Sequence, residues 1–367
     1  MASFSFGFGG DDIEDDGQSH AQTGTAETAS NDPAVTPSAA VSSAFPVAGK
    51  PQLPAVSHRL DDMLQKLPSK IAFGTLDMPM KDGTTIRVPR RELWDIKVQV
   101  MAEDDELGDG AEGLGDHDVK TGIYEGGFKS WESSVDLVKV LGQEGHLAKV
   151  GNTSLRVIEL GCGTALPSLA VFSQAAQGSP TATGAHLSIV VADYNPSVLQ
   201  LATMPNFILA WALAQRNACE ALKDAFDMED ELELAPEVVE AFKDFLEKRR
   251  ISLTFLSGGW SPEFITLLYD EAPDLESPRN TLVLGAETIY SPFALESFTQ
   301  TIFRIMTQEK THDGSVCETI VAAKKLYFGV GGSLDDFIDK SKAKGATIRQ
   351  LMEETQGVWR GVVSCAL

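Results

Sequence analysis

The chain has little cysteine, and the four residues that it has are scattered. Cys162, Cys219, Cys317 and Cys365 show no C-x-x-C spacing, and the six histidines show no paired ligand spacing. This pattern excludes a dense disulfide framework and a zinc site built on cysteine pairs. We therefore expect a reducing compartment and no bound metal.

Long apolar runs and positive charge are also scarce. No stretch approaches the 18 consecutive apolar residues of a membrane span, and the N-terminus lacks the basic start and apolar core of a signal peptide. The 53 acidic and 30 basic residues give a net charge of −23. Non-specific nucleic-acid binding depends on Lys and Arg neutralising phosphates, so the charge argues against it. We expect an intracellular protein without a membrane or direct nucleic-acid partner, and its charge favours a basic partner.

What the chain does contain is centred on Leu155–Thr164, LRVIELGCGT. An apolar, β-branched run leads directly into the triplet GCG, as in a buried parallel strand that ends in a glycine turn. Residues 166–176 then have the pattern of a helix, with Pro167 in its first turn. Strand, glycine turn and helix form the first unit of a nucleotide-binding α/β sheet.

The glycine motif is incomplete as a dinucleotide fingerprint. G-x-G-x-x-G needs a third glycine three residues after Gly163, where the chain has Leu166. Glu159 precedes the turn, and a carboxylate there suits the cationic amino group and sulfonium of S-adenosylmethionine. The motif favours this ligand over NAD, and a plain strand–turn–helix connection is the alternative.

Three more strand-like runs end in residues with functional potential. Residues 187–191 lead to Asp193, which can accept both ribose hydroxyls of a nucleoside or can cap the following helix. Residues 251–256 lead to Trp260, which can stack on adenine or fill the core. The fourth run, Thr281–Ala286, leads to the sequence ETIY at its carboxyl end, where ligands bind in such sheets.

Helical patterns separate the strand-like runs, which predicts a doubly wound, Rossmann-like α/β sheet over residues 121–367. A fifth run covers residues 315–323, and runs at 347–351 and 358–365 form a closing antiparallel pair, for seven strands in all. Residues 217–250 are acidic and indicate an insertion of two helices that is broken at Pro236. Most of its charges are expected on a solvated face.

The N-terminal third is different. Residues 1–54 are low in complexity and bury too little apolar surface to offset chain entropy, so we expect a disordered tail. Its Phe4–Phe8 stretch is a short strand, a docking peptide or an unstructured part of the tail. Residues 55–120 are expected as an N-terminal extension that packs on the domain formed by residues 121–367. We expect a helix at 58–68, short strands at 71–98 around a turn at Lys81-Asp82-Gly83, and a loop at 102–118.

Residues 121–137, TGIYEGGFKSWESSVDL, set glycines among aromatic residues just before the first strand of the sheet. Such a segment can fold over a ligand, or it can pack on the edge of the sheet. From Trp131 onward the pattern becomes helical.

Taken together, the motifs LGCGT, ADYN, SGGW, ETIYSP, YFGVGG and TGIYEGGFKSWE resemble one family of seven-stranded methyltransferases. The set is similar to the protein-histidine N-methyltransferases that act on a large-subunit ribosomal protein, and the N-terminal SFSFGF resembles that family's fungal members. The resemblance covers residues 120–367 and the first ten residues.

The resemblance implies an S-adenosylmethionine site. The residues implied or suggested for it are Ser130, Trp131, Glu132, Ser133, Ser134, Glu159, Gly161, Gly163, Asp193, Tyr194, Asn195, Gly258, Gly259, Trp260 and Ala286. Ala286 departs from the family pattern, in which a serine can occur, so a hydroxyl contact there is absent whereas a backbone contact is not affected.

Histidine methylation needs positioning more than a strong base, because an imidazole with a pKa near 6.5 is already mostly neutral at pH 7. Glu287 or Asn195 is the expected acceptor for the second ring N–H, and Tyr290 the expected wall of the substrate slot. Burial as a cap or packing residue is the alternative for each. Catalysis then follows mainly from orientation of the imidazole against the methyl group.

Two other functions stay open on the sequence. The first is a protein-lysine methyltransferase with the same fold, since ETIY is shared with such enzymes. The second is a non-catalytic module that binds a ribosomal protein. For the histidine enzyme, the resemblance implies a basic large-subunit ribosomal protein as substrate, and we expect a monomer in the cytoplasm and nucleus.

Overall fold

A computed structural model of the chain describes residues 49–107, 119–120, 124–125, 127–178, 184–226, 228, 230–275, 279–327 and 331–367. The Phe4–Phe8 stretch and most of the expected tail lie outside these residues.

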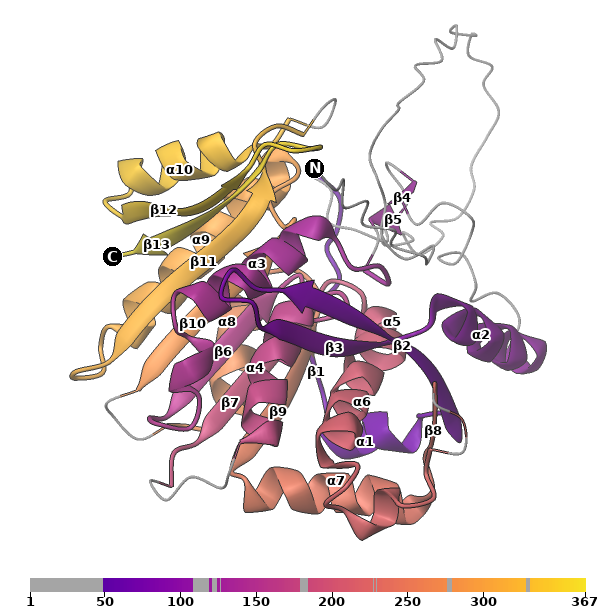
Figure 1. The fold of residues 1–367 in the computed structure, drawn as a ribbon. Coiled ribbons are helices and arrows are strands. Elements are labelled where there is room, and N and C mark those ends of the chain that lie inside the picture. The colour runs from indigo at the N-terminus through magenta and orange to yellow at the C-terminus, as the bar shows by residue number, and fades with distance from the viewer. Residues whose placement is uncertain are drawn as a thin grey trace, which may run out of the picture.

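A mixed eight-stranded sheet organises the described chain (Figure 1). Its spatial order is β1 (Val56–His58), β9 (Ile251–Ser257), β7 (Leu187–Asp193), β6 (Leu155–Leu160), β10 (Asn280–Ala286), β11 (Val316–Lys324), β13 (Arg360–Ala366) and β12 (Thr347–Glu354). The five strands from β9 to β11 are parallel, whereas β1, β13 and β12 pair antiparallel with their neighbours. The predicted Rossmann-like fold and the closing antiparallel pair are therefore confirmed, and β1 is an additional eighth strand.

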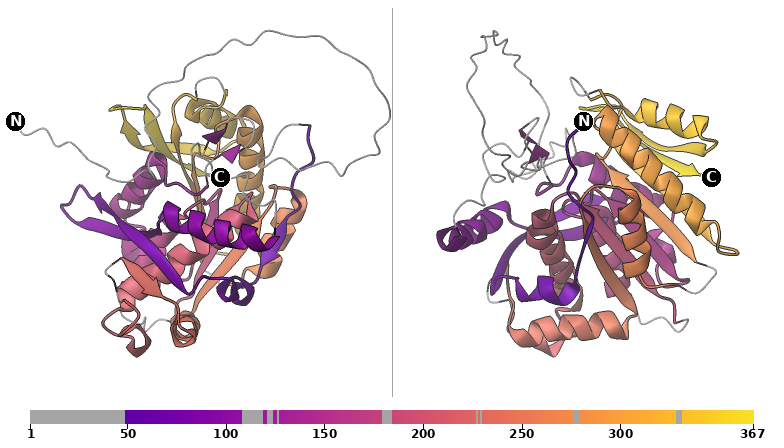
Figure 2. Two further views of the ribbon diagram at one scale, coloured as in Figure 1. Left: turned by 90° about the vertical axis from the view of Figure 1, so that its right-hand side faces the viewer. Right: turned by 180° about the vertical axis from the view of Figure 1, so that it is seen from behind.

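Helices cover both faces of the sheet. The face that carries Val157 and Ile189 packs against α1 (Leu60–Gln65), α3 (Glu132–Gln143), α4 (Leu166–Gln177), α6 (Met204–Gln215) and α7 (Pro236–Lys248). The face that carries Ile158 and Val190 packs against α8 (Pro262–Glu271), α9 (Pro292–Glu309) and α10 (Leu334–Ala343), as the rear view in Figure 2 shows for α9. Because helices cover the central parallel strands on both faces of the sheet, every residue of β6 and β7 is buried.

A continuous helical stretch runs beneath the glycine turn. The short helix α5 (Pro196–Val198), a π-helical turn over Leu199–Thr203 and α6 form the segment Pro196–Gln215. Among the described residues this segment is apolar and long enough to cross a membrane, but 78% of its most apolar window is buried in the protein. Core helices of soluble proteins also pass such a test, so the expectation of no membrane partner stays a prediction.

The N-terminal region forms a hairpin and an unexpected helix. β2 (Lys70–Pro79) and β3 (Thr85–Arg91) pair across the turn predicted at Lys81-Asp82-Gly83. Residues 93–98 are not a strand, and the expected loop does not begin at 102, because α2 spans Leu93–Leu107. Leu93, Ile96 and Val100 recur at helical spacing and pack against Phe128 and residues 198–202, which explains the correction.

The described residues of the acidic insertion form one long helix and not two. Its first half holds a 3₁₀ turn at Glu220–Leu222 and the strand β8 (Glu231–Glu233), which pairs antiparallel with β2. The predicted helix after Pro236 is α7, which buries Val238, Phe242 and Leu246. The free edge of β2 thus decides the structure of residues 231–233, which have no strand pattern of their own.

The remaining described elements are short. They are a 3₁₀ turn at Leu147–Lys149 and the two-stranded antiparallel pair β4 (Val119–Lys120) and β5 (Tyr124–Glu125). Residues 121–123 lie outside the described chain, so the domain boundary expected between residues 120 and 121 stays a prediction.

Candidate functional site

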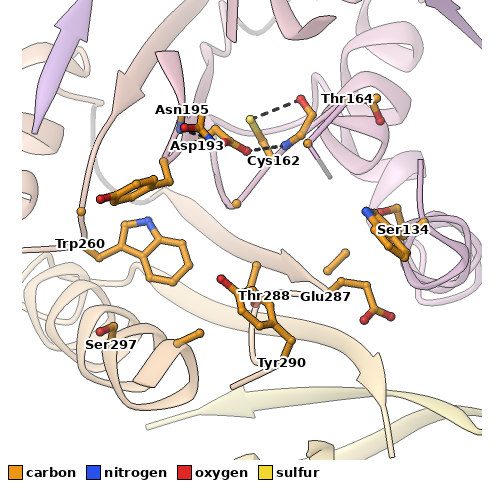
Figure 3. Close-up of a pocket in the computed structure, with 18 of the residues that line it drawn as sticks. Ser134, Cys162, Thr164, Asp193, Asn195, Trp260, Glu287, Thr288, Tyr290 and Ser297 are labelled. Carbon is orange, nitrogen blue, oxygen red and sulfur yellow. Dashed lines mark hydrogen bonds between the residues drawn. The ribbon is translucent and has the colours of Figure 1, made fainter. Parts of the chain in front are cut away.

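The carboxyl ends of β6, β7, β9 and β10 surround a cavity of about 130 Å³ (Figure 3). Most of the residues that the sequence suggested lie around it. These are Trp131, Ser134, Gly161, Gly163, Asp193, Tyr194, Asn195, Gly258, Gly259, Trp260, Ala286, Glu287 and Tyr290. The fold therefore brings together segments that are more than 150 residues apart in the chain.

Four of the suggested residues do not line this cavity. The Ser130 hydroxyl is 2.9 Å from that of Thr164, and the Glu132 carboxylate pairs with Arg360. The Ser133 hydroxyl donates to Glu287, a residue that does line the cavity. Glu159 is 2% exposed and lies behind the glycine turn.

The glycine turn leaves no room for side chains. Gly161 and Gly163 have positive φ angles of 66° and 50°, which favour glycine. A Cβ on Gly161 would lie 2.8 Å from Cγ2 of Thr288, and one on Gly163 would lie 3.0 Å from the carbonyl oxygen of Gly127. The turn thus packs directly against the ETIY segment and against the segment before α3.

Asp193 occupies the carboxyl end of β7 and is held by two backbone donors. Its Oδ2 accepts the Gly163 N–H at 3.0 Å, and its Oδ1 accepts the Asn195 N–H at 3.0 Å. Burial raises the pKa of this carboxyl, although the backbone donors act in the opposite direction. A carboxylate has about four acceptor positions, so each oxygen can accept one more hydrogen bond from a ligand.

Glu159 holds the start of α4. Its Oε2 accepts the Ser168 N–H at 2.9 Å, and Ser168 lies in the first turn of the helix, where backbone N–H groups lack intrahelical partners. Burial raises the pKa of Glu159 to about 7. The suggested contact between Glu159 and a cationic ligand group is thus replaced by a helix-capping contact in the described structure.

The raised pKa of Glu159 makes stability depend on pH. A buried carboxylate is disfavoured, so stability is greatest while the group is protonated and falls as pH rises from about 4.3, the usual pKa of an unfolded glutamate, through about 7. Glu159→Gln keeps the acceptor for Ser168 and removes the titration. The unfolding free energy of Glu159→Gln minus that of the wild type should therefore be about 2 kcal/mol larger at pH 8 than at pH 5. Urea titrations at both pH values measure this, and parallel pH profiles would contradict it.

Glu287 has an unusual backbone and two hydroxyl partners. Its φ is +57°, a left-handed conformation that is costly for a residue with a Cβ. Its Oε1 accepts from the Ser133 hydroxyl, and its Oε2 accepts from the Tyr327 hydroxyl at 2.6 Å. These contacts from α3 and from the segment after β11 fix the carboxylate at the cavity.

Asn195 and Glu287 were both suggested as acceptors for the substrate ring. Figure 3 shows Asn195 beside Asp193, across the cavity from Glu287, whereas Tyr290 lies near Glu287. The geometry therefore separates one end of the cavity, with Asp193 and Asn195, from another end with Glu287 and Tyr290.

The sequence reasoning missed several lining residues, among them Gln52, Lys129, Cys162, Thr164, Thr288 and Ser297. Cys162 and Thr164 lie inside the motif LGCGT, and Thr288 lies inside ETIY. Because both motifs were assigned to the site, these three residues could have been predicted as well. Burial raises the pKa of the Cys162 thiol well above its usual value, which keeps it protonated. Gln52 comes from the stretch expected to be disordered, where nothing in the sequence indicated a site.

Among the residues that the structure describes, no group of three or more His, Cys, Asp or Glu side chains is placed to hold a metal ion.

No family model matches the chain, but individual proteins do. Histidine protein methyltransferase 1 of Saccharomyces cerevisiae is 37% identical over 270 residues, which cover 68% of this chain and 67% of that protein. Histidine protein methyltransferase 1 of Schizosaccharomyces pombe is 32% identical over 324 residues, or 86% of this chain and 87% of that protein.

Solved structures show weaker similarity. The N-terminal domain of human METTL16, solved in complex with SAH, gives a TM-score of 0.33 at 12% identity and covers 64% of this chain and 69% of that one. A score this low supports no inference about the site. The identities to the two yeast proteins are what assign the family. The chain belongs to the histidine protein methyltransferase 1 family, and it is a protein-histidine methyltransferase with the fold of S-adenosylmethionine-dependent methyltransferases.

Proposed function

We propose that the cavity binds S-adenosylmethionine with its adenosine at Asp193 and its methyl group toward Glu287, and that the methyl acceptor is a histidine of a basic large-subunit ribosomal protein. The observation that carries the proposal is the arrangement of two carboxylates at different ends of one cavity, Asp193 at the nucleoside end and Glu287 beside Tyr290.

The residues around the cavity fit this cofactor. The glycine turn is a cradle in which a Cβ would collide with Thr288, so backbone and ligand can approach closely there. Thr288 also lines the cavity, and its methyl group lies against the glycine turn. Asp193 supplies acceptors for ribose hydroxyls, and Tyr194 and Trp260 supply aromatic surface beside it.

The cofactor supplies a methyl group that is activated by its sulfonium. The protein's part is to hold a neutral imidazole in line with that methyl group, and Glu287 is placed to accept the N–H of the other ring nitrogen. This bond selects the tautomer whose bare nitrogen faces the methyl group. The Ser133 and Tyr327 hydroxyls keep the carboxylate from turning, and orientation of this kind supplies much of the rate in such reactions.

A basic protein substrate fits the surface beside this end of the cavity. Leu326, which precedes Tyr327, is 53% exposed, and Trp359 is 55% exposed. The Lys325 N–H donates to the Trp359 carbonyl at 2.8 Å, which holds these two segments together. Large exposed apolar side chains next to a site are typical of protein recognition surfaces.

Carboxylates flank this apolar pair. The Trp359 Nε1–H donates to Glu353 at 2.8 Å, and Asp335, which is largely exposed, pairs with Lys325 at 3.0 Å. Together with the net charge of −23, they favour a partner that carries Lys and Arg around its target residue. A ribosomal-protein substrate also implies the cytoplasm and nucleus, where such proteins are made and assembled.

Mass spectrometry of ribosomal proteins from cells with and without this gene tests the proposal. We expect one histidine of one large-subunit protein to carry a single methyl group in the parent cells and none in the deleted cells. Purified enzyme and S-adenosylmethionine should restore the modification on ribosomal proteins from the deleted cells. A full set of ribosomal histidine modifications in the deleted cells would contradict the proposed substrate.

A further inference from the structure

Arg360, the first residue of β13, is buried and bonds to the beginning of α3. Its Nε donates to Oδ2 of Asp136 at 2.8 Å, and its Nη1 donates to the Glu132 carboxylate. Both carboxylates belong to α3 and lie one helical turn apart on the same side of the helix. A single guanidinium therefore ties the start of α3 to strand β13.

Ser133 lies between these two carboxylates in the sequence of α3. Its side chain is fully buried, and its hydroxyl donates to Oε1 of Glu287. Glu132 directly precedes Ser133, and Asp136 follows three residues later, so Arg360 holds the helix on both sides of the hydroxyl. The position of the Ser133 hydroxyl at Glu287 thus depends on the bonds that Arg360 makes.

The other contacts of Glu287 come from β11 and from the segment that follows it. The Glu287 N–H donates to the Ala322 carbonyl of β11 at 3.0 Å. Tyr327, which follows β11, donates its hydroxyl to Oε2 of Glu287 at 2.6 Å. Arg360 pairs with Lys324 across β11 and β13, and so it joins the two supports of Glu287, the sheet on one side and α3 on the other.

Charge also links Arg360 to Glu287. Burial by itself lowers the pKa of the Arg360 guanidinium. Three carboxylates, those of Asp136, Glu132 and Glu287, act in the opposite direction, and the net shift of the pKa is upward. The guanidinium therefore stays charged, and its bonds to α3 are charge-assisted hydrogen bonds, which are shorter and stronger than neutral ones and more exact in geometry.

We propose that Arg360 is a positioning residue for methyl transfer, which fixes the start of α3 so that Ser133 holds Glu287 in the orientation that accepts the substrate N–H. The inference rests on the proposed function of Glu287 as that acceptor. Arg360 is not among the described residues that line the cavity, so it acts through its neighbours. Its loss should slow methyl transfer and leave cofactor binding unchanged.

The test is a double-mutant cycle with Arg360→Met, Ser133→Ala and the variant that combines them. Turnover is measured with saturating S-adenosylmethionine on ribosomal proteins from cells that lack this gene. We expect each single change to lower turnover roughly tenfold, because each weakens one hydrogen bond to a charged group. The combined variant should also lose roughly tenfold and not a hundredfold, because both changes remove the same contact. Cofactor affinity by calorimetry should stay within about twofold of the wild type in all three variants.

Arg279→Met is the matched control. Arg279 is buried and pairs with Glu309 at 3.0 Å and with Asp274 at 3.2 Å, but it directly precedes β10, at the end of the strand opposite to the cavity. Its loss also breaks a buried ion pair, yet it should leave the turnover of the folded protein within about a factor of two. If Arg279→Met slows turnover as much as Arg360→Met does, the effect of Arg360 is one of stability alone and the inference is wrong.

Arg360→Lys is the second variant, for use if Arg360→Met does not fold, because it keeps a positive charge beside Asp136. An ammonium lacks the planar fork that reaches both carboxylates, so turnover should still fall roughly threefold or more, and Ser133→Ala should cancel this loss. Losses that multiply in either cycle would show that Arg360 does not act through Ser133. Unchanged turnover of Glu287→Gln would instead overturn the proposed role of Glu287.

Discussion

Glu287→Gln is expected to lower the turnover number by roughly ten- to a hundredfold, with little change in cofactor affinity. The glutamate accepts hydrogen bonds on both oxygens, from Ser133 and from Tyr327. A glutamine has one acceptor oxygen, so one of the two hydroxyls loses its partner and the amide N–H₂ opposes the substrate N–H. Steady-state kinetics on the purified substrate, together with calorimetry for the cofactor, measure both quantities.

The matched control is Glu271→Gln, which makes the same change at an exposed position at the end of α8. It should leave turnover within about a factor of two, because surface changes away from a site seldom exceed about 0.5 kcal/mol. If Glu287→Gln also stays within that range, Glu287 does not orient the target ring.

Gly161→Arg is expected to abolish cofactor binding, with at least a hundredfold loss of affinity by calorimetry. Its φ of +66° is strained for any residue with a Cβ, and that Cβ would lie 2.8 Å from Thr288 and 3.8 Å from the ring of Trp260. Thr288 and Trp260 both line the cavity, so the arginine side chain competes with the cofactor for the same space. Circular dichroism should show that the fold is retained.

Gly83→Arg is the matched control for this substitution. Gly83 has a similar positive φ, +85°, in the turn between β2 and β3, but a Cβ there meets nothing within 4 Å. Gly83→Arg thus carries the same kind of backbone strain without filling the cavity, and it should bind the cofactor like the wild type. A folded Gly161→Arg protein with unchanged affinity would contradict the role assigned to the glycine turn.

The central sheet could be predicted because its strands are buried on both faces and read as apolar runs. β6 and β7 are fully buried; β6 leads directly into Gly161, and β7 ends at Asp193. The carboxyl ends of parallel strands meet at one edge of a sheet, so Gly161, Asp193 and Glu287, which stand at or directly after the ends of such runs, could be expected at the same edge. The order of the strands within the sheet comes from the structure.

Other parts depend on contacts that the local sequence does not encode. β8 is a strand because its three residues pair with the edge of β2. α2 is a helix whose apolar side packs against Phe128. Gln52 sits in a polar, low-complexity stretch, and its position follows from bonds to Tyr194 and Gly259 that are made by its neighbour Leu53. Tertiary partners decide such segments, as they do for most short strands.

The sequence drew attention to Glu159 but did not determine which group its carboxylate contacts. A carboxylate before a glycine turn can face a ligand or can turn back to the following helix, and the residue pattern is the same for both. The structure shows the second arrangement, with the Glu159 carboxylate bonded to the first turn of α4. The hydrogen-bond partners of Glu287 could not be predicted from the sequence either, because Ser133 and Tyr327 are separated by nearly two hundred residues.

The choice between histidine and lysine as the methylated residue tests the central claim most directly. The measurement compares, by mass spectrometry, the initial methylation rates of the proposed ribosomal substrate and of a variant in which its target histidine is replaced by lysine. A lysine is protonated at pH 7 because its pKa is about 10.4, whereas the proposed role of Glu287 is to accept the N–H of a neutral ring. We predict a single methyl group on the histidine substrate and no detectable methylation of the lysine variant. Equal rates on the two substrates would contradict the account and would assign the cavity to lysine methylation.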